Sequence, residues 1–323
     1  MKTINWGIIG LGKIAHKFAQ DLLEVEHAKL YAVASRDQDK ANAFAKRYQA
    51  INAYGKYEDL AKDSRINAVY IATPHSFHKT HTILCLNHNK AVLCEKPFAM
   101  NLQDVDAMIA TAKANDVLLM EALWTYFLPH YQFVLNHLEN NTYGKIIRME
   151  ADFGFKPEVD MTSRVFKKSL GGGSLLDIGI YPIFAALSVL GQPTQIESSA
   201  TYFDNGVDSS CLMTFNYDQG VEANLKSTFL EDVPTEAIFY CERATLKIHT
   251  RFHEPSSVTI ASEDKKKTFD FETTGSGYYY EIVHFNELIR QQKTESDIMT
   301  YDFSRKLITL LDTVRSQIGL SYE

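Results

Sequence analysis

Short apolar runs alternate with helical stretches over roughly the first 122 residues of the chain. Five runs are apolar along almost their whole length, at residues 5–9, 30–34, 68–72, 91–94 and 118–121. Strands of this kind, separated by helices, predict a parallel sheet that is covered on both faces. One of the helices should begin after Asn101, whose side chain can cap it, because apolar residues follow at helical spacing. The pattern therefore predicts a doubly wound α/β domain.

The pattern changes beyond about residue 145. Six segments rich in Phe, Tyr, Thr and Ser follow one another with short turns, at residues 145–153, 195–203, 208–217, 220–229, 237–240 and 244–249. They predict an α+β domain with an open, mostly antiparallel sheet, one face of which is partly uncovered. Because a broad exposed sheet face often meets a partner subunit, we expect a homodimer through that face.

We accordingly expect two domains, at residues 1–122 and 123–323, which is a usual number for a chain of 323 residues. The last helix, near residues 302–318, has an apolar stripe and can pack back on the first domain.

Composition and charge exclude several kinds of partner. The formal net charge of -7 argues against nucleic acid and anionic membranes, and the longest basic run, 265–267, should be a solvated hairpin tip. No apolar run reaches membrane-spanning length, and the chain opens with a strand rather than a signal peptide. The four cysteines form no C-x-x-C pair, which suggests a reducing, cytoplasmic location.

The glycines after the first predicted strand form a dinucleotide-binding motif. Gly10 permits a sharp turn, Gly12 lets phosphates approach the backbone, and Ala15 lets the following helix pack against the strand. The helix N-terminus then presents unpaired N–H groups to the phosphates. The alternative is a tight turn that binds nothing. The motif predicts cofactor contacts from Gly10, Leu11, Gly12, Lys13, Ile14 and Ala15.

The end of the second predicted strand distinguishes the two nicotinamide dinucleotides. Sites specific for NAD usually have an acidic side chain there, which binds the ribose 2′-hydroxyl. Here Ser35 and Arg36 take that place, and a guanidinium can bind a 2′-phosphate through charge-assisted hydrogen bonds. We therefore expect NADP(H) as the cofactor. In the alternative, Arg36 is a solvated surface residue and Asp37 binds the ribose.

The loop after the third predicted strand should also face the cofactor, because ligands in such folds bind beyond the carboxyl ends of the strands. We expect contacts from Thr73, Pro74, His75 and His78. His75, His78 and His81 are evenly spaced, as metal ligands can be, but no carboxylate or cysteine accompanies them. Helix capping or cofactor contact explains them equally well, and no metal is expected.

Glu95, Lys96 and Pro97 follow the fourth predicted strand and should also lie at the cofactor. The proline keeps Lys96 in an extended backbone, so the lysine should project from the strand end near the nicotinamide. The alternative is an exposed surface lysine before a turn.

Three glycines, at 171–173, precede an apolar helix in the second half of the chain. Asp177 and Tyr181 are four residues apart and should share one face of that helix. A carboxylate among so many apolar residues needs a partner, and Lys96 is a candidate. The alternative is a structural pair that satisfies the backbone.

The glycine motif, residues 95–97 and residues 171–181 together resemble the glucose–fructose oxidoreductase/inositol dehydrogenase (Gfo/Idh/MocA) family. Residues 53–61, 91–97 and 120–125 resemble its dimeric dihydrodiol dehydrogenase branch, which includes NADP-dependent D-xylose dehydrogenases. The likeness runs through most of the first 190 residues and implies an N-terminal Rossmann domain before the α+β domain. Tyr126 departs from the arginine of the animal enzymes, which leaves the substrate open.

The resemblance implies that Lys96 and Tyr181 are the catalytic pair, with Asp177 orienting Lys96 or the substrate hydroxyls. It predicts an NADP(H)-dependent oxidoreductase that acts on a secondary alcohol or carbonyl group of a sugar, polyol or trans-dihydrodiol. Two alternatives remain: a non-catalytic NADP-binding sensor, and an NAD-dependent glycosidase-like hydrolase on the same two-domain plan. The side chains expected around the substrate are Trp124, Phe153, Phe155 and Arg164.

Overall fold

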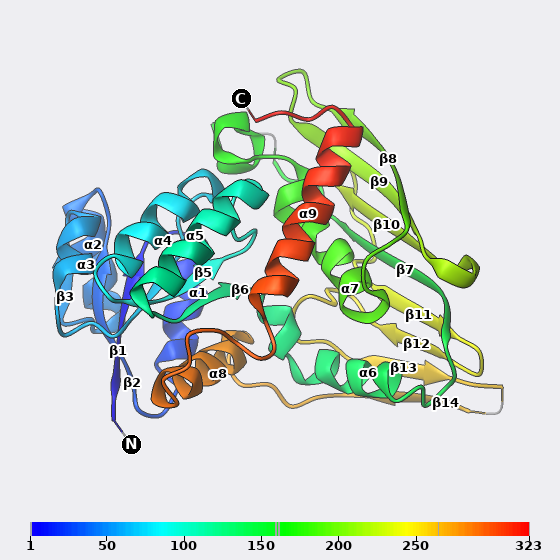
Figure 1. Ribbon diagram of the computed structural model, residues 1–323, viewed down its shortest axis with the longest axis horizontal. Helices are drawn as coiled ribbons and strands as arrows, with labels where there is room; N and C mark the ends of the chain where they lie inside the picture. The colour runs from blue at the N-terminus through cyan, green and yellow to red at the C-terminus, as the bar shows by residue number, and fades with distance from the viewer. Residues whose placement is uncertain (1, 159, 161, 264, 323) are drawn as a thin grey trace. The chain divides into compact units, whose positions relative to one another are not determined.

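The computed structural model describes residues 2–158, 160, 162–263 and 265–322 (Figure 1). The chain forms two compact units, Met1–Trp124 with Thr274–Arg305, and Thr125–Thr273 with Lys306–Glu323. The sequence pattern places everything after residue 122 in one domain, whereas Thr274–Arg305 belongs to the first unit. The last helix, α9 (Tyr301–Gln317), crosses from one unit into the other.

The first unit contains a six-stranded parallel sheet in the order β3-β2-β1-β4-β5-β6, which confirms the predicted doubly wound domain. The sequence pattern misses β3, which has only three residues, none of them fully buried. Asn101 caps α5 as expected, because its side chain accepts a hydrogen bond from the Asp104 N–H at 2.8 Å. The elements of the unit are β1 (Ile4–Ile9), α1 (Lys13–Leu22), β2 (Ala28–Ala34), α2 (Gln38–Tyr48), β3 (Asn52–Tyr54), α3 (Tyr57–Lys62), β4 (Ala68–Ile71), α4 (His78–Leu86), β5 (Ala91–Glu95), α5 (Leu102–Asn115), β6 (Leu119–Ala122) and α8 (Tyr278–Arg290).

Helix α8 joins the first unit through a buried carboxylate. Asp21, at the end of α1, accepts hydrogen bonds from the backbone N–H groups of Ser276 and Tyr278 at 2.8 Å. The carboxylate thus satisfies N–H groups that a helix start leaves without an intrahelical partner. Asn286 of α8 in turn accepts a hydrogen bond from the Trp6 indole of β1 at 3.0 Å. These long-range contacts explain why α8 packs on the parallel sheet.

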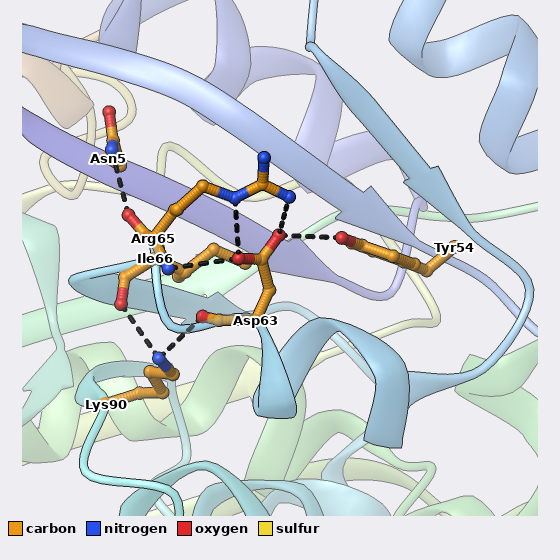
Figure 2. A network of polar contacts seen from close by, with 6 residues as sticks. All are labelled: Asn5, Tyr54, Asp63, Arg65, Ile66 and Lys90. Carbon is orange, nitrogen blue, oxygen red and sulfur yellow. Dashed lines mark hydrogen bonds and ion pairs between the residues drawn. The ribbon is translucent and has the colours of Figure 1, made fainter.

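A polar network fixes the segment before β4 to neighbouring strands (Figure 2). The Asp63 carboxylate accepts hydrogen bonds from the Arg65 guanidinium at 3.0 and 3.1 Å and from the Tyr54 hydroxyl of β3 at 2.7 Å. The Arg65 hydrogen bonds lower the pKa of Asp63 to about 2. Lys90, before β5, donates to the Asp63 and Ile66 carbonyls at 2.7 and 3.0 Å. The network supports a strand as short as β3.

The second unit contains an eight-stranded sheet in the order β14-β13-β12-β11-β7-β10-β9-β8. Only β7 and β10 pair in parallel, so the sheet is mostly antiparallel, as predicted. Helices α6 and α7 pack on the sheet through β12 and through β7 and β10. The elements are α6 (Pro129–Glu139), β7 (Ile146–Gly154), α7 (Ile180–Leu190), β8 (Gln195–Tyr202), β9 (Asp208–Asn216), β10 (Glu222–Thr228), β11 (Ala237–Cys241), β12 (Thr245–Ile248), β13 (Val258–Ala261) and β14 (Lys266–Phe269).

Two expectations about this unit are wrong. Lys168–Leu190 is long and apolar enough to span a membrane by length and composition, with a mean hydropathy of 1.7 over its most apolar 18 residues, although the sequence analysis expects no such run. Its most apolar stretch is 78% buried, because α7 is a core helix of the unit. Lys266 and Lys267 lie in strand β14 rather than at a hairpin tip. Lysines are common on edge strands, where charge opposes pairing with other chains.

Candidate functional site

The turn between β1 and α1 has the shape that a pyrophosphate needs. Gly10 has φ +89°, and a Cβ there would lie 2.7 Å from the backbone of Ala72. A Cβ on Gly12 would meet nothing within 4 Å, which leaves open space at the start of α1. No side chain caps this helix, so its first N–H groups remain available to an anion. The predicted glycine cradle therefore fits the phosphates of a dinucleotide.

The end of β2 favours a 2′-phosphate over a free ribose hydroxyl. Asp37, the alternative ribose ligand, caps α2 by accepting the Lys40 N–H at 3.1 Å. Ser35 is buried and its hydroxyl accepts the Asp37 N–H at 3.2 Å. Arg36 is exposed and interacts with the Tyr57 phenol through its guanidinium. The cation at this strand end is therefore held next to open solvent, where a phosphate can reach it.

The predicted cofactor loop after β4 is tied to the turn that carries Lys96. The ring nitrogens of buried His78 lie 2.8 Å from the carbonyl oxygens of Pro97 and Thr73. His75 is also buried, with its ring 5.7 Å from that of His78. His81 contacts the Thr73 hydroxyl at 3.0 Å, and burial lowers the pKa of His81 to about 4. Among the residues the structure describes, no group of three or more His, Cys, Asp or Glu could hold a metal ion.

The Lys96 turn is also held from β6. The Phe98 N–H donates to Glu121 Oε1 at 2.9 Å. Glu95, at the end of β5, accepts a hydrogen bond from the Tyr70 hydroxyl and, at 3.3 Å, from the Lys96 N–H. The predicted lysine therefore has a backbone that is fixed on both sides.

Burial raises the pKa of Glu121 to about 7. The carboxyl is 2% exposed, and the negative charge of Glu95 raises its pKa further, while the Lys96 ammonium and hydrogen bonds oppose the shift. Sequence reasoning missed this residue, because a single glutamate at the end of an apolar strand has no motif.

The glycine-rich segment of the second unit forms a π-helical turn, Leu175–Gly179, which runs directly into α7. An ordinary α-helix was expected here. Pro182 has no N–H to donate to the residue four positions earlier, and the wider turn accommodates this loss. A Cβ on Gly179 would approach Ser227 Oγ of β10 to 3.0 Å, so the turn packs closely on the sheet.

Asp177 finds a partner within its own unit. Arg164 donates from its guanidinium to Asp177 Oδ1 at 2.8 Å, and Asp177 is 8% exposed. Asp177, predicted to orient Lys96 or the substrate hydroxyls, and Arg164, predicted to line the substrate pocket, therefore form an ion pair. Lys96, the expected partner, lies in the other unit.

Asp208 of β9 anchors the start of the π-helical turn. It accepts hydrogen bonds from the Leu175 N–H at 2.7 Å and from the Ser174 hydroxyl at 2.9 Å. Burial raises the pKa of Asp208 to about 6. No sequence motif pointed to this residue, which fixes the segment that bears Asp177 and Tyr181.

The predicted pocket aromatics fall into different units. Trp124 stacks on Tyr278 in the first unit, with ring centroids 4.4 Å apart. Phe153 lies in the second unit, 5.6 Å from the Tyr181 ring and 6.3 Å from the Phe155 ring. Tyr181 is 5% exposed. The second unit therefore brings Tyr181 and two of the predicted pocket residues together.

A phosphate-binding parallel-sheet unit followed by a mostly antiparallel α+β unit defines a two-domain, dinucleotide-binding class of protein. Residues 4–123 match the model described as an oxidoreductase family with an NAD-binding Rossmann fold, and residues 131–247 match the GFO/IDH/MocA C-terminal domain. The chain is 35% identical to a trans-1,2-dihydrobenzene-1,2-diol dehydrogenase of Danio rerio, over 99% of this chain and 98% of that one. The chain belongs to the Gfo/Idh/MocA oxidoreductase family.

Further similarities fit this assignment. The chain is 32% identical to a scyllo-inositol 2-dehydrogenase (NADP(+)) of Bacillus subtilis (strain 168), over 99% of this chain and 98% of the relative. A crystal structure of a 3-ketoreductase from Actinomadura kijaniata with NADP and TDP-benzene has a TM-score of 0.88 at 25% identity, over 98% of each chain. An aldose-aldose oxidoreductase from Caulobacter crescentus, with glycerol, shares the fold with a TM-score of 0.91 at 21% identity over 98% of each chain.

The two glycines of the phosphate turn should respond differently to alanine. Gly10→Ala should destabilise the cofactor-free protein by about 2 kcal/mol or more, because the added Cβ meets the Ala72 backbone at a positive φ. Gly12→Ala should fold within about 1 kcal/mol of the wild type but bind NADPH about tenfold to a hundredfold more weakly, because it fills the phosphate space. Denaturant unfolding and NADPH fluorescence titration measure the two effects. Equal NADPH affinity in Gly12→Ala would contradict the assignment.

Because the pKa of Glu121 is raised, we expect the free energy of unfolding to depend on pH. The folded state keeps the Glu121 proton up to about pH 7, whereas the unfolded chain releases it near its ordinary value, so this stabilising contribution is complete at low pH and is lost as pH rises through about 7. Glu121→Gln keeps the acceptor for Phe98 and cannot ionise. Its stability relative to wild type should rise between pH 5 and pH 8, by at most about 3 kcal/mol. Urea unfolding at both pH values, with exposed Glu24→Gln as control, measures this; a constant difference would refute it.

Proposed function

We propose that the chain is an NADP(H)-dependent oxidoreductase that transfers hydride between nicotinamide and a secondary alcohol or carbonyl group of a sugar, polyol or trans-dihydrodiol. One observation carries the proposal: a single edge of the parallel sheet bears both the phosphate turn and Lys96. This follows from the parallel pairing, because β1 and β5 end at the same edge. A phosphate cradle and an ammonium group at one edge suit a redox dinucleotide and an oxygen-bearing substrate.

The preference for NADP(H) rests on Arg36. Asp37 is engaged as a helix cap, so the end of β2 offers a guanidinium rather than a carboxylate. The names of the inositol dehydrogenase and of the ketoreductase complex both include NADP, which supports the same preference. NADPH and NADH titrations of the wild-type protein measure it, and tighter binding of NADH would contradict the role given to Arg36.

The roles of the side chains are hypotheses about proton movement. Bound NADP⁺ would supply the hydride acceptor. Tyr181 would take the proton of the substrate hydroxyl, and Lys96 would donate a hydrogen bond to the same oxygen. A phenol ordinarily ionises near pH 10, so such a base needs a cation, which Lys96 would provide. Asp177, paired with Arg164, would orient the substrate hydroxyls.

The substrate class is supported by the relatives and by the aromatic side chains. The dihydrodiol and inositol dehydrogenases are named for ring substrates with hydroxyl groups. Phe155 is 36% exposed and can offer an apolar face to such a ring, and its own ring lies 6.3 Å from that of Phe153, which packs against Tyr181. Trp124, stacked on Tyr278, is a further aromatic side chain proposed to contact the substrate.

The two alternatives are less favoured by the residues present. A non-catalytic sensor has no need for Lys96, Asp177 and Tyr181 together. A glycosidase-like hydrolase would cleave glycosides without net reduction of the cofactor. A panel of alcohols with NADP⁺, followed at 340 nm, identifies the dehydrogenase by a steady rise in absorbance. Glycoside cleavage without that rise identifies the hydrolase, and neither activity is expected of the sensor.

Lys96→Met and Tyr181→Phe should each lower turnover at least about a hundredfold, the usual scale of general acid–base catalysis. NADPH binding should remain within a few-fold of wild type, because neither change touches the phosphate turn. Lys29→Met and Tyr240→Phe, distant changes of the same kind, are the controls. Steady-state kinetics and NADPH titration measure these quantities. Near-normal turnover in Lys96→Met or Tyr181→Phe would contradict the proposed roles.

The outer face of the eight-stranded sheet supports the expected homodimer. Leu212 of β9 is 52% exposed on this face. It lies in a shallow depression lined mainly by residues of β7, β8, β9, β10 and β11. Leu212→Glu should lower the molar mass seen by light scattering from that of a dimer to that of a monomer, because it adds a negative charge to a depression already lined by several acidic side chains, which would repel one another across the interface. A monomeric mass of the wild type at micromolar concentration would contradict the dimer.

We also propose a cytoplasmic location. Cys85, Cys94, Cys211 and Cys241 are all buried and form no disulfide, which suits a reducing compartment. Fractionation of the source cells tests the location.

A further inference from the structure

A buried histidine packs against Tyr181 in the second unit. His253 lies between β12 and β13 and is 4% exposed. Its imidazole stacks on the ring of Phe153, with centroids 4.1 Å apart, and lies 4.7 Å from the Tyr181 ring at 45°. The imidazole and the phenol ring therefore pack against each other inside the second unit.

The backbone of this loop is anchored so that His253 has a defined position. The His253 carbonyl accepts a hydrogen bond from the Thr125 hydroxyl at 2.8 Å. The Phe252 carbonyl lies 2.9 Å from His130 Nε2, and the Phe252 N–H donates to the Thr235 carbonyl at 3.1 Å. Three separate elements therefore hold the segment.

A charged pair leads from His253 toward solvent. His253 Nε2 lies 3.8 Å from Glu254 Oε1, and the Arg251 guanidinium donates to both Glu254 oxygens at 2.7 and 2.6 Å. The Glu254 and Arg251 side chains are 22% and 54% exposed. Arg251 has φ +63°, an unfavourable conformation for arginine, and its paired hydrogen bonds to Glu254 help to offset that cost.

We propose that His253 and Glu254 form a proton-exchange route between Tyr181 and solvent, with Arg251 positioning Glu254. The inference rests on the function proposed above for Tyr181. During alcohol oxidation the substrate hydroxyl gives its proton to the Tyr181 phenolate. The phenol then passes a proton to the imidazole, the imidazolium passes one to Glu254, and water takes it. Carbonyl reduction uses the same steps in reverse, so no other reactant is needed.

The surroundings of His253 suit this role. The titratable and charged groups around it are Tyr181 from α7, His130 from α6, and Arg251 and Glu254 from its own loop. Burial lowers the pKa of His130 to about 4, so that ring stays neutral. The Tyr181 phenol interacts electrostatically with Arg251, whose fixed positive charge favours the phenolate. A buried phenol with a cation nearby and an imidazole beside it can exchange protons without direct access to water.

The first test needs no turnover. Tyrosine Cζ labelled with ¹³C reports ionisation by NMR, and Tyr181→Phe identifies the Tyr181 signal in the cofactor-free protein. In the wild type this signal should show a second inflection from His253 in addition to its own titration. His253→Phe keeps the ring packing but removes the nitrogens, so that inflection should disappear. His249→Gln is the control, because His249 lies in the same loop but contacts Thr259 of β13. This variant should keep the second inflection. Identical curves in wild type and His253→Phe would overturn the coupling.

The second test follows turnover in the NADP(H)-loaded enzyme. His253→Phe and Glu254→Gln should lower kcat at least about tenfold while leaving the substrate KM within about twofold, because the relay acts after binding. His253→Ala should recover activity when free imidazole is added, a result that a purely structural role would not give. If His253→Phe folds poorly, His253→Gln replaces it. A wild-type kcat in His253→Phe or His253→Gln, together with no rescue of His253→Ala by imidazole, would contradict the proposed relay.

The two proposals fail separately. If Lys96→Met and Tyr181→Phe lower turnover but the His253 variants do not, the oxidoreductase assignment stands and the relay falls. If no alcohol reduces NADP⁺ in the wild type, the assigned function falls, while the NMR titration still decides whether His253 and Tyr181 are coupled.

Discussion

The buried imidazole ring of His78 connects the loops that follow β4 and β5, and these loops carry predicted cofactor contacts. His78 contacts the Thr73 carbonyl after β4 and the Pro97 carbonyl after β5, both at 2.8 Å. A neutral imidazole has one N–H, so it can donate to only one of these oxygens at a time. The two loops therefore share a single polar anchor, and a shift of one is felt by the other. Glu121 accepts a hydrogen bond from the Phe98 N–H on the other side of the Lys96 turn. The backbone of Lys96 is therefore held in place without the cofactor.

The sequence could predict those parts of the fold that depend on neighbouring residues. The apolar strands, the Asn101 cap and the glycine turn each follow from a few adjacent positions, and the structure contains all three. The return of α8 to the first unit could not be predicted, because it depends on Asp21 accepting N–H groups from Ser276 and Tyr278 far along the chain. Likewise β3 is too short to show a periodicity, and the Asp63 network supports it instead.

The first unit buries more acid than the sequence suggests, and this changes the charge near Glu95. Glu281 of α8 is fully buried, neither of its oxygens has a hydrogen-bond partner among the described residues, and burial together with Glu95 raises its pKa well above the usual range. Burial also raises the pKa of Glu121 to about 7, so both carboxyls hold their protons more tightly than exposed glutamates do. An ammonium group at Lys96 therefore faces fewer permanent anions than the residue types imply. Proton uptake by these carboxyls, invisible in the sequence, lets them stay buried.

Helical periodicity predicts that Asp177 and Tyr181 share one helix face, but it could not give their surroundings. Residues four apart lie roughly on one face in a π-helical turn as in an α-helix, but this spacing does not say which neighbours that face meets. The direction of Tyr181 depends instead on tertiary contacts: Asp208 fixes the start of the turn and Gly179 packs it on β10. The same tertiary contacts present the phenol ring to Phe153 and His253, which come from other elements. The sequence pattern could therefore propose Tyr181 as an acid–base residue, whereas His253, which packs on its ring, could be found only from the tertiary structure.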